Sequence, residues 1–174
     1  ARLRRLDEEA EIIILERSGY VSYANCGLPY YIGGDITDRE ELTLQTPQSF
    51  WDRYRIEVRT EHEAIRIDPV SKQVYVRNLK ENTEYTESYD KLILSPGAKP
   101  VVPQIPGLER DRVFTLRTVE DTFRIYNEIQ SLCPKKAAVI GGGFIGLEMA
   151  ENLVHRGIEV TLFQRSDQVM PPLD

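Results

Sequence analysis

The sequence predicts an α/β fold of the Rossmann-like, doubly wound type with a small antiparallel insertion. Three observations carry this prediction. Short continuous apolar runs are typical of parallel strands, residues 141–146 form a glycine-rich strand-to-helix turn, and apolar and polar residues alternate between residues 55 and 89. The 174 residues are 41% hydrophobic and 29% charged, an ordinary balance for a globular protein.

The chain begins with the predicted end of an amphipathic helix. In residues 1–9, Leu3 and Leu6 lie on one face with charges around them. Residues 12–15 follow as a continuous apolar run, which indicates a strand buried in a parallel sheet. This order is the second half of a β-α-β unit. We therefore expect its first strand and glycine turn to precede residue 1 in a longer protein.

The middle of the chain changes period. Thr46 and Pro47 predict a helix start, as N-cap and first helical residue. Alternation then predicts a small antiparallel excursion, with a turn at residues 69–72. Its three segments are residues 55–59, 64–68 and 73–77.

A second group of elements follows the alternating stretch. Residues 91–95 indicate another buried strand, ended by Pro96 and Gly97. Residues 98–113 are rich in proline and glycine and predict a linker. Residues 118–132 predict a helix.

The glycine turn predicts a dinucleotide site. A strand at residues 137–140 leads into Gly141, Gly143 and Gly146, with helix expected from Leu147 onward. In this G-x-G-x-x-G motif the three glycines permit a tight turn, close approach to a pyrophosphate and close helix packing. The pyrophosphate binds the free N–H groups at the helix start. The alternative is a glycine-rich turn without a ligand.

The end of the next strand, residues 159–163, selects the coenzyme. An acid there would accept a hydrogen bond from the ribose 2′-hydroxyl of NAD. Gln164 and Arg165 stand there instead, which removes a repulsion and offers a cation to a 2′-phosphate. This favours NADPH or mixed use of NADPH and NADH. The alternative is that Arg165 only faces solvent.

Cys26 is the candidate redox centre. If residues 27–31 begin a helix, the thiol lies at a helix N-terminus, where its pKa falls. The alternative is an inert packing cysteine. Glu16 ends the first strand, where a Rossmann unit holds an adenosine ribose, or it simply ends the strand. Cys133, before Pro134, has no such setting and is interpreted as structural.

Composition narrows the function classes. The net charge of −6 and the lack of a basic stripe argue against nucleic acid as a partner. No apolar run reaches membrane-spanning length, and no export signal is seen. Two distant cysteines argue against a disulfide scaffold or a zinc site and favour a cytoplasmic setting.

The cysteine loop resembles a known family. Residues 22–34, which read SYANCGLPYYIGG, are similar to the active-site loop of the CoA-disulfide reductases, with Tyr23 in place of the usual phenylalanine. These are single-cysteine members of the FAD-dependent pyridine nucleotide–disulfide oxidoreductases. The resemblance covers the whole chain, and further matches are residues 89–98, 114–117, 141–148 and 168–172.

The resemblance implies roles for individual residues. Cys26 would form a mixed disulfide with coenzyme A, or a persulfide or sulfenic acid. Arg5, Ser22 and Asn25 would contact CoA, and Glu16 would hold the ribose of FAD. The strand-end motif lining FAD would be Ser95, Pro96 and Gly97. Independently of the resemblance, three arginines near the start of the chain give positive charge that suits a phosphorylated ligand: Arg2, Arg4 and Arg5. The alternative is that these arginines lie on a solvated helix face.

These expectations combine into one functional hypothesis. Residues 1–117 would form a partial FAD-binding domain and residues 118–174 the start of an NAD(P)H-binding domain, so both nucleotide-binding units are incomplete. The intact homodimer would reduce CoA disulfide or CoA persulfide with FAD and NADPH or NADH, whereas the fragment itself would be inactive. The alternatives are an NADH oxidase or peroxidase using a cysteine sulfenic acid, and a non-catalytic nucleotide-binding module or thiol sensor.

Overall fold

The computed structural model describes residues 1–170. Of the sequence match at residues 168–172, Pro171 and Pro172 lie outside the described residues. The chain divides into two compact units. The first unit comprises residues 1–23 and 43–97, and the second comprises residues 24–42 and the chain from residue 98 onward. These units differ from the predicted functional division at residue 117, which stays a prediction.

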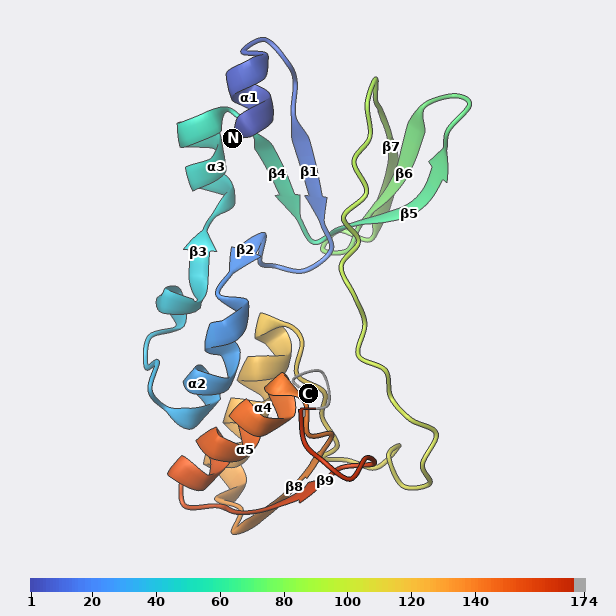
Figure 1. Cartoon of the computed structure of the whole chain (residues 1–174). Helices are drawn as coiled ribbons and strands as arrows, with labels where there is room; N and C mark the ends of the chain where they lie inside the picture. The colour runs from blue at the N-terminus through green and yellow to red at the C-terminus, as the bar shows by residue number, and fades with distance from the viewer. Residues whose placement is uncertain (171–174) are drawn as a thin grey trace. The chain divides into compact units, whose positions relative to one another are not determined.

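The first unit is built around a parallel strand pair. Strand β1 (Ile13–Glu16) lies beside β4 (Glu57–Thr60), with Glu16 opposite Thr60 (Figure 1). The predicted strand at residues 12–15 is therefore present and parallel, although half-buried rather than buried. Helix α1 (Arg2–Leu6) precedes β1, and α3 (Pro47–Tyr54) precedes β4.

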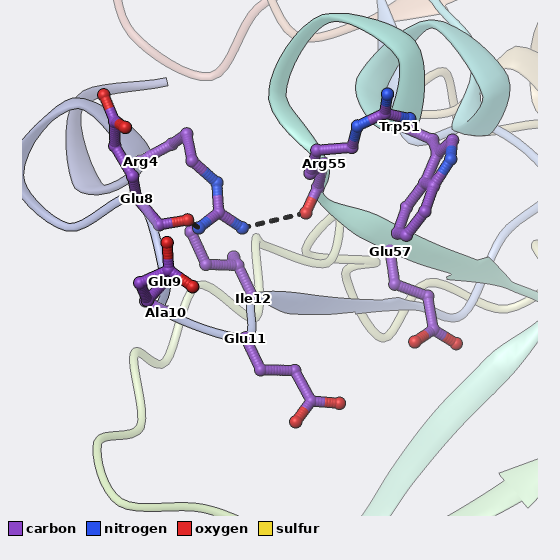
Figure 2. Close-up of a pocket in the computed structure, with 9 residues that line it drawn as sticks. All are labelled: Arg4, Glu8, Glu9, Ala10, Glu11, Ile12, Trp51, Arg55 and Glu57. Atoms are coloured by element: carbon purple, nitrogen blue, oxygen red, sulfur yellow. Dashed lines mark hydrogen bonds between the residues drawn. The ribbon is translucent and has the colours of Figure 1, made fainter.

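Three side chains fix the ends of α3. Thr46 Oγ1 accepts a hydrogen bond from the Ser49 N–H, and Ser49 Oγ accepts one from the Thr46 N–H. This reciprocal cap begins the helix where the sequence predicts it. At the other end, Arg4 of α1 donates Nε to the carbonyl of Tyr54 at 2.9 Å. Its Nη2 donates to the carbonyl of Arg55 at 2.9 Å (Figure 2). The arginine thus satisfies carbonyls that a helix end leaves unpaired.

A three-stranded antiparallel sheet also belongs to the first unit. Its order is β5 (His62–Asp68), β6 (Gln73–Asn78) and β7 (Thr83–Ser88), and the turn at residues 69–72 joins the first two strands. The antiparallel excursion is confirmed, but assigning residues 55–59 to it was wrong. That segment becomes β4 and pairs with β1 in parallel, because period two reports a half-buried strand and not its partner.

The buried strand predicted at residues 91–95 is not formed. Those residues have no regular secondary structure, and the side chains of Ile93 and Leu94 are 71% and 67% exposed. A buried parallel strand needs hydrogen-bonded neighbours on its edges. Among the described residues none pairs with this segment, so its apolar pattern has no sheet to enter.

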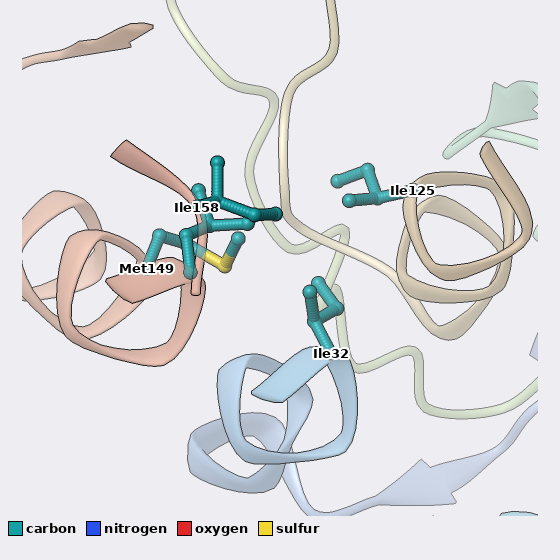
Figure 3. Packing of buried hydrophobic residues seen from close by; sticks show 5 residues of the cluster. Ile32, Ile125, Met149 and Ile158 are labelled. Atoms are coloured by element: carbon teal, nitrogen blue, oxygen red, sulfur yellow. The ribbon is translucent and has the colours of Figure 1, made fainter. Parts of the chain in front are cut away.

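The second unit packs three helices over a strand pair. Helices α2 (Leu28–Gly33), α4 (Val119–Leu132) and α5 (Phe144–His155) surround one buried cluster (Figure 3). Its members are Ile32, Ile125, Met149, Leu153 and Ile158. Burying side chains of this size contributes about 1.5–3 kcal/mol each before entropy is counted. The helix after Cys26 is therefore part of this unit's core.

The strand pair of the second unit carries the glycine turn. Strands β8 (Lys136–Ile140) and β9 (Glu159–Phe163) are parallel, and α5 connects them. The predicted strand-turn-helix-strand order is confirmed, with α5 beginning at Phe144 rather than Leu147. Helix α4 spans the predicted residues, with Thr118 as its N-cap and a capping box to Asp121.

The remaining elements are short. The first unit also contains the antiparallel pair β2 (Ser22–Tyr23) and β3 (Thr43–Gln45), and the second contains the 3₁₀ turns η1 (Asn25–Gly27) and η2 (Arg39–Leu42). None of the described helices combines the length and the apolar character that crossing a bilayer requires.

Candidate active site

Cys26 lies at the centre of η1, directly before α2. Its thiol is free and exposed. Hydrogen bonds from the Gly27 N–H to Ala24 O and from the Ala24 N–H to Leu42 O hold the turn at 2.9 and 2.8 Å. An added Cβ at Gly27 would lie 3.1 Å from Ile36 Cδ1, so tight packing fixes the turn below the cysteine. The expected position at a helix start is therefore observed.

Asn25, the neighbour of Cys26, is held by a residue far along the chain. Its Oδ1 accepts a hydrogen bond from Arg117 Nη1 at 3.2 Å. Arg117 in turn leads into α4, where its N–H donates to Asp121 Oδ2 at 3.1 Å. The sequence showed Arg117 only as the last residue of a family match, without a role. The structure gives it one, because it orients the amide of Asn25 next to Cys26.

The residues expected to contact CoA divide between the two units. Asn25 lies beside Cys26 in the second unit, whereas Arg5 and Ser22 belong to the first. Ser22 starts β2 and is paired with Gln45. Arg5 is exposed on α1. The structure therefore places Asn25 next to Cys26, and the roles of Arg5 and Ser22 in CoA binding stay predictions.

Arg4 is structural, unlike its neighbour. Besides the two α3 carbonyls, it donates Nη1 to Glu8 O at 2.6 Å. The cavity beside it, of about 280 Å³, is bordered by four glutamates and two arginines, a lining that repels phosphate. Arg5 is absent from this lining. Of the three arginines expected near a phosphorylated ligand, Arg4 is thus committed to the fold.

This contrast gives a matched pair of variants. In the intact protein, Arg4→Met should lower the free energy of unfolding by about 2 kcal/mol, because helix-end carbonyls lose a charged donor. Arg5→Met should change it by less than about 0.5 kcal/mol, since Arg5 is exposed. Chemical denaturation of both variants measures the difference. Equal stabilities would contradict the structural role of Arg4.

Glu16 ends β1 at the carboxyl edge of the parallel pair. Its Oε1 accepts a hydrogen bond from the Ser18 N–H at 2.7 Å, which fixes the half-buried carboxylate at that edge. In Rossmann-type folds this is where an acid meets a ribose hydroxyl. The other FAD residues expected, Ser95, Pro96 and Gly97, lie in an exposed irregular segment, so their role stays a prediction.

A neighbouring arginine ties the Glu16 strand pair to the antiparallel sheet. Arg59 lies on β4 opposite Leu15 and donates to Glu57 at 2.6 Å and to Tyr85 Oη at 3.0 Å. It also pairs with Glu87 of β7. The hydrogen bond to Glu57, with those to Tyr85 and Glu87, raises the pKa of Arg59. This cation therefore holds the sheet that carries Glu16.

The glycine turn leaves room for a phosphate. Gly141 has φ +104°, a conformation that favours glycine, and its N–H donates to Phe163 O at 2.8 Å. An added Cβ at Gly143 would meet nothing within 4 Å, whereas at Gly146 it would meet the Gly141 carbonyl oxygen. Gly143 is the N-cap of α5 and no side chain caps that helix. Its first N–H groups therefore suit an anion.

Gln164 and Arg165 follow β9 beside this turn. Gln164 is half-buried and hydrogen-bonded to the turn, whereas Arg165 is exposed. The middle glycine, Gly142, also has a role that the motif did not predict, because a Cβ there would lie 2.9 Å from Val169 Cγ1. Cys133, expected to be structural, ends α4 with φ +46° and an exposed side chain, so it is outside the core.

Comparison with known proteins decides the family. The family model described as pyridine nucleotide-disulphide oxidoreductase matches residues 1–174. The chain belongs to this family. Members of this family use FAD together with NADH or NADPH, so the predicted family, fold class and cofactors are confirmed.

Two similar proteins in this family carry coenzyme A disulfide reductase, or its abbreviation CoADR, in their names. The chain is 45% identical over all its residues to coenzyme A disulfide reductase from Staphylococcus aureus strain JH9, of which it covers 39%. The reduced Bacillus anthracis CoADR-RHD structure is 55% identical, with a TM-score of 0.97, and is covered over 31% of its length. The chain spans about two fifths of the curated relatives it matches.

Other solved members of the family broaden the comparison. An NAD-dependent persulfide reductase from A. fulgidus is 38% identical, with a TM-score of 0.91, over 98% of this chain and 31% of that one. An engineered NADPH oxidase derived from the Lactobacillus brevis enzyme, bound to NADPH, is 33% identical, with a TM-score of 0.91. The match covers 98% of this chain and 37% of the oxidase. These structures share the fold of both units.

Proposed function

We propose that this chain carries the redox centre of an NAD(P)H-dependent reductase of CoA disulfide or CoA persulfide, with Cys26 as its single redox cysteine. The observation that carries the proposal is the exposed Cys26 thiol directly before α2. Its neighbour Asn25 is oriented by Arg117, and the chain is 45% identical to a CoA disulfide reductase. The second cysteine, Cys133, ends a different helix.

A single cysteine requires the second sulfur to come from the substrate. The Cys26 thiolate attacks one sulfur of CoA disulfide, forms a mixed disulfide with one CoA and releases the other as a thiolate. FAD, when bound, passes the two electrons of one NAD(P)H to such a disulfide. Breaking the mixed disulfide then releases the second CoA thiolate and restores the Cys26 thiolate. The rigid turn below Cys26 keeps the sulfur in one place through both steps.

The residues present fit both nucleotide cofactors. Glu16 offers a fixed carboxylate at a strand end for the ribose of FAD. The uncapped start of α5 and the open space at Gly143 suit the pyrophosphate of NAD(P)H. We assign residues 1–117 to FAD and residues 118–174 to NAD(P)H in function, and expect Ser95–Gly97 to line FAD.

Arg165 supports NADPH as the preferred coenzyme. In the engineered NADPH oxidase, three consecutive replacements turn Asp-Ala-Met into Ala-Arg-Ser, eighteen positions after a replaced glycine. In this chain Gln164, Arg165 and Ser166 begin eighteen positions after Gly146. This chain retains its glycine, which the engineered oxidase replaced with alanine, but it has an arginine followed by serine at the same spacing, and a guanidinium there can pair with a 2′-phosphate.

The setting of the intact enzyme follows from the same reasoning. Two free thiols suit a reducing, cytoplasmic compartment. We expect a homodimer, as the CoA-disulfide reductase resemblance implies, and small thiol compounds rather than nucleic acid as partners. A net charge of −6 agrees with the last point.

Turnover of the intact enzyme tests the proposal against the oxidase alternative, which the likeness to the engineered NADPH oxidase favours. NADPH and NADH consumption would be followed with CoA disulfide, with CoA persulfide and with oxygen alone. We expect a CoA substrate to support much faster oxidation than oxygen does, and NADPH to be preferred. Fast turnover with oxygen alone would establish the oxidase instead.

A further inference from the structure

The loop after β9, residues 164–170, closes over the middle of the glycine turn. Gly142 donates its N–H to Gln164 Oε1 at 2.9 Å, and its carbonyl accepts from the Met170 N–H at 2.8 Å. A Cβ at Gly142 would lie 2.9 Å from Val169 Cγ1. Both backbone groups of Gly142 are therefore used by this loop, so the Gly142 N–H is committed to Gln164.

The side-chain amide of Gln164 binds both the glycine turn and the rest of the loop. While Oε1 accepts from the turn, Nε2 donates to Ser166 Oγ at 2.5 Å and to Gln168 O at 3.3 Å. Ser166 Oγ also donates to Gln168 O, at 2.8 Å. An amide has two donor hydrogens and one carbonyl oxygen, so both Nε2 hydrogens are engaged inside the loop. A carboxylate could keep the contact with Gly142 but not these two donations.

These contacts separate the roles of Gln164 and Arg165. Gln164 has no amide hydrogen left for a ligand, while Arg165 beside it is exposed. Among the described residues, Arg165 has no hydrogen bond or ion pair. Of these two residues, Arg165 is therefore the one with a charge to offer a 2′-phosphate, and it stands in the loop that Gln164 closes.

We propose that Gln164 is a positioning residue for coenzyme selection, which latches residues 164–170 onto Gly142 and so fixes Arg165 for the 2′-phosphate of NADPH. This inference rests on the proposed preference for NADPH. It goes beyond removal of a negative charge, because it requires the hydrogen-bonding ends of the amide. It also explains why a glycine stands at the variable second position of the motif: a side chain there would push the loop away.

Equilibrium binding of NADP⁺ and NAD⁺ to the intact protein tests the latch. Arg165→Gln should lower the affinity for NADP⁺ by about tenfold or more, which corresponds to the loss of one charge-assisted hydrogen bond. Gln164→Met, in which the new side chain is similar in volume but makes no hydrogen bonds, should lower the affinity for NADP⁺ by roughly fivefold and that for NAD⁺ by less than about twofold. The double variant should bind NADP⁺ no more weakly than Arg165→Gln does, because interacting residues are not additive.

Gln168→Met is the matched control. Its backbone carbonyl, not its side chain, accepts the loop hydrogen bonds, so neither affinity should change. Equal losses of affinity for NADP⁺ and NAD⁺ in Gln164→Met would contradict the positioning role of Gln164. So would a loss of NADP⁺ affinity that adds to that of Arg165→Gln. If Arg165→Gln alone weakens NADP⁺, the coenzyme proposal stands without the latch. If Arg165→Gln has no effect, both fail.

Discussion

Replacing Cys26 by serine in the intact enzyme should abolish reduction of CoA disulfide, with a loss of at least about 10³-fold in kcat. A serine hydroxyl cannot form the mixed disulfide through which a single-cysteine enzyme accepts its substrate. Affinity for NADP⁺ should stay unchanged, because the glycine turn is a separate part of the chain. The rate of NADPH oxidation with CoA disulfide measures the effect.

Cys133→Ser supplies the control for this prediction. Its thiol is exposed too, at the end of α4, and serine tolerates that position, so activity should be retained. The intact mass under non-reducing conditions gives an independent readout. Wild-type protein treated with CoA disulfide should gain one CoA, and Cys26→Ser should gain none. Undiminished turnover by Cys26→Ser would contradict the role of Cys26 as the redox centre.

The local signals in the sequence proved reliable where one short segment determines the structure. The cap at Thr46 begins α3 as expected, and α4 begins directly after Thr118 within the segment predicted to be helical, because a capping box depends on residues only three apart. The glycine turn also forms where the motif predicts it, between β8 and α5. In each case the information is contained within a few neighbouring residues.

Sequence reasoning failed where a segment depends on a distant partner. The apolar run at residues 91–95 looks like a buried strand, yet it stays exposed because none of the described residues pairs with it. Residues 55–59 alternate like the hairpin strands that follow, but their partner is β1 and the pairing is parallel. Periodicity gives the faces of a strand and not its neighbours.

The site shows the same limit. The motif identified Gly141, Gly143 and Gly146, whereas Gly142 is constrained only by a loop that returns after β9. The family match at Arg117 gave no role, because its partner Asn25 lies 92 positions away. Side chains that orient other side chains leave no local pattern, so a structure was needed to find them.

The Gly33→Ala variant should lower the free energy of unfolding of the intact protein by about 2 kcal/mol, the usual cost of overpacking a core. An added Cβ at Gly33 would lie 1.9 Å from Asn152 Oδ1 and 3.0 Å from Asn152 Cβ. Asn152 is 2% exposed, and its Nδ2 donates to Glu148 O at 2.8 Å. The Asn152 side chain cannot move away from the new methyl group without breaking its hydrogen bond within α5. Chemical denaturation measures the loss.

Two further variants separate packing from a general effect of alanine. Adding Asn152→Ala removes the carboxamide that the new methyl group meets, so the double variant should recover part of the stability that Gly33→Ala loses. Gly143→Ala has open space and an ordinary φ of −83°, so it should leave stability unchanged while weakening NADP⁺ at the turn. A Gly33→Ala variant as stable as wild type would contradict the close contact. Since Gly33 lies on the helix that follows Cys26 and Asn152 on the helix that follows the glycine turn, this contact fixes α2 against α5 within one unit.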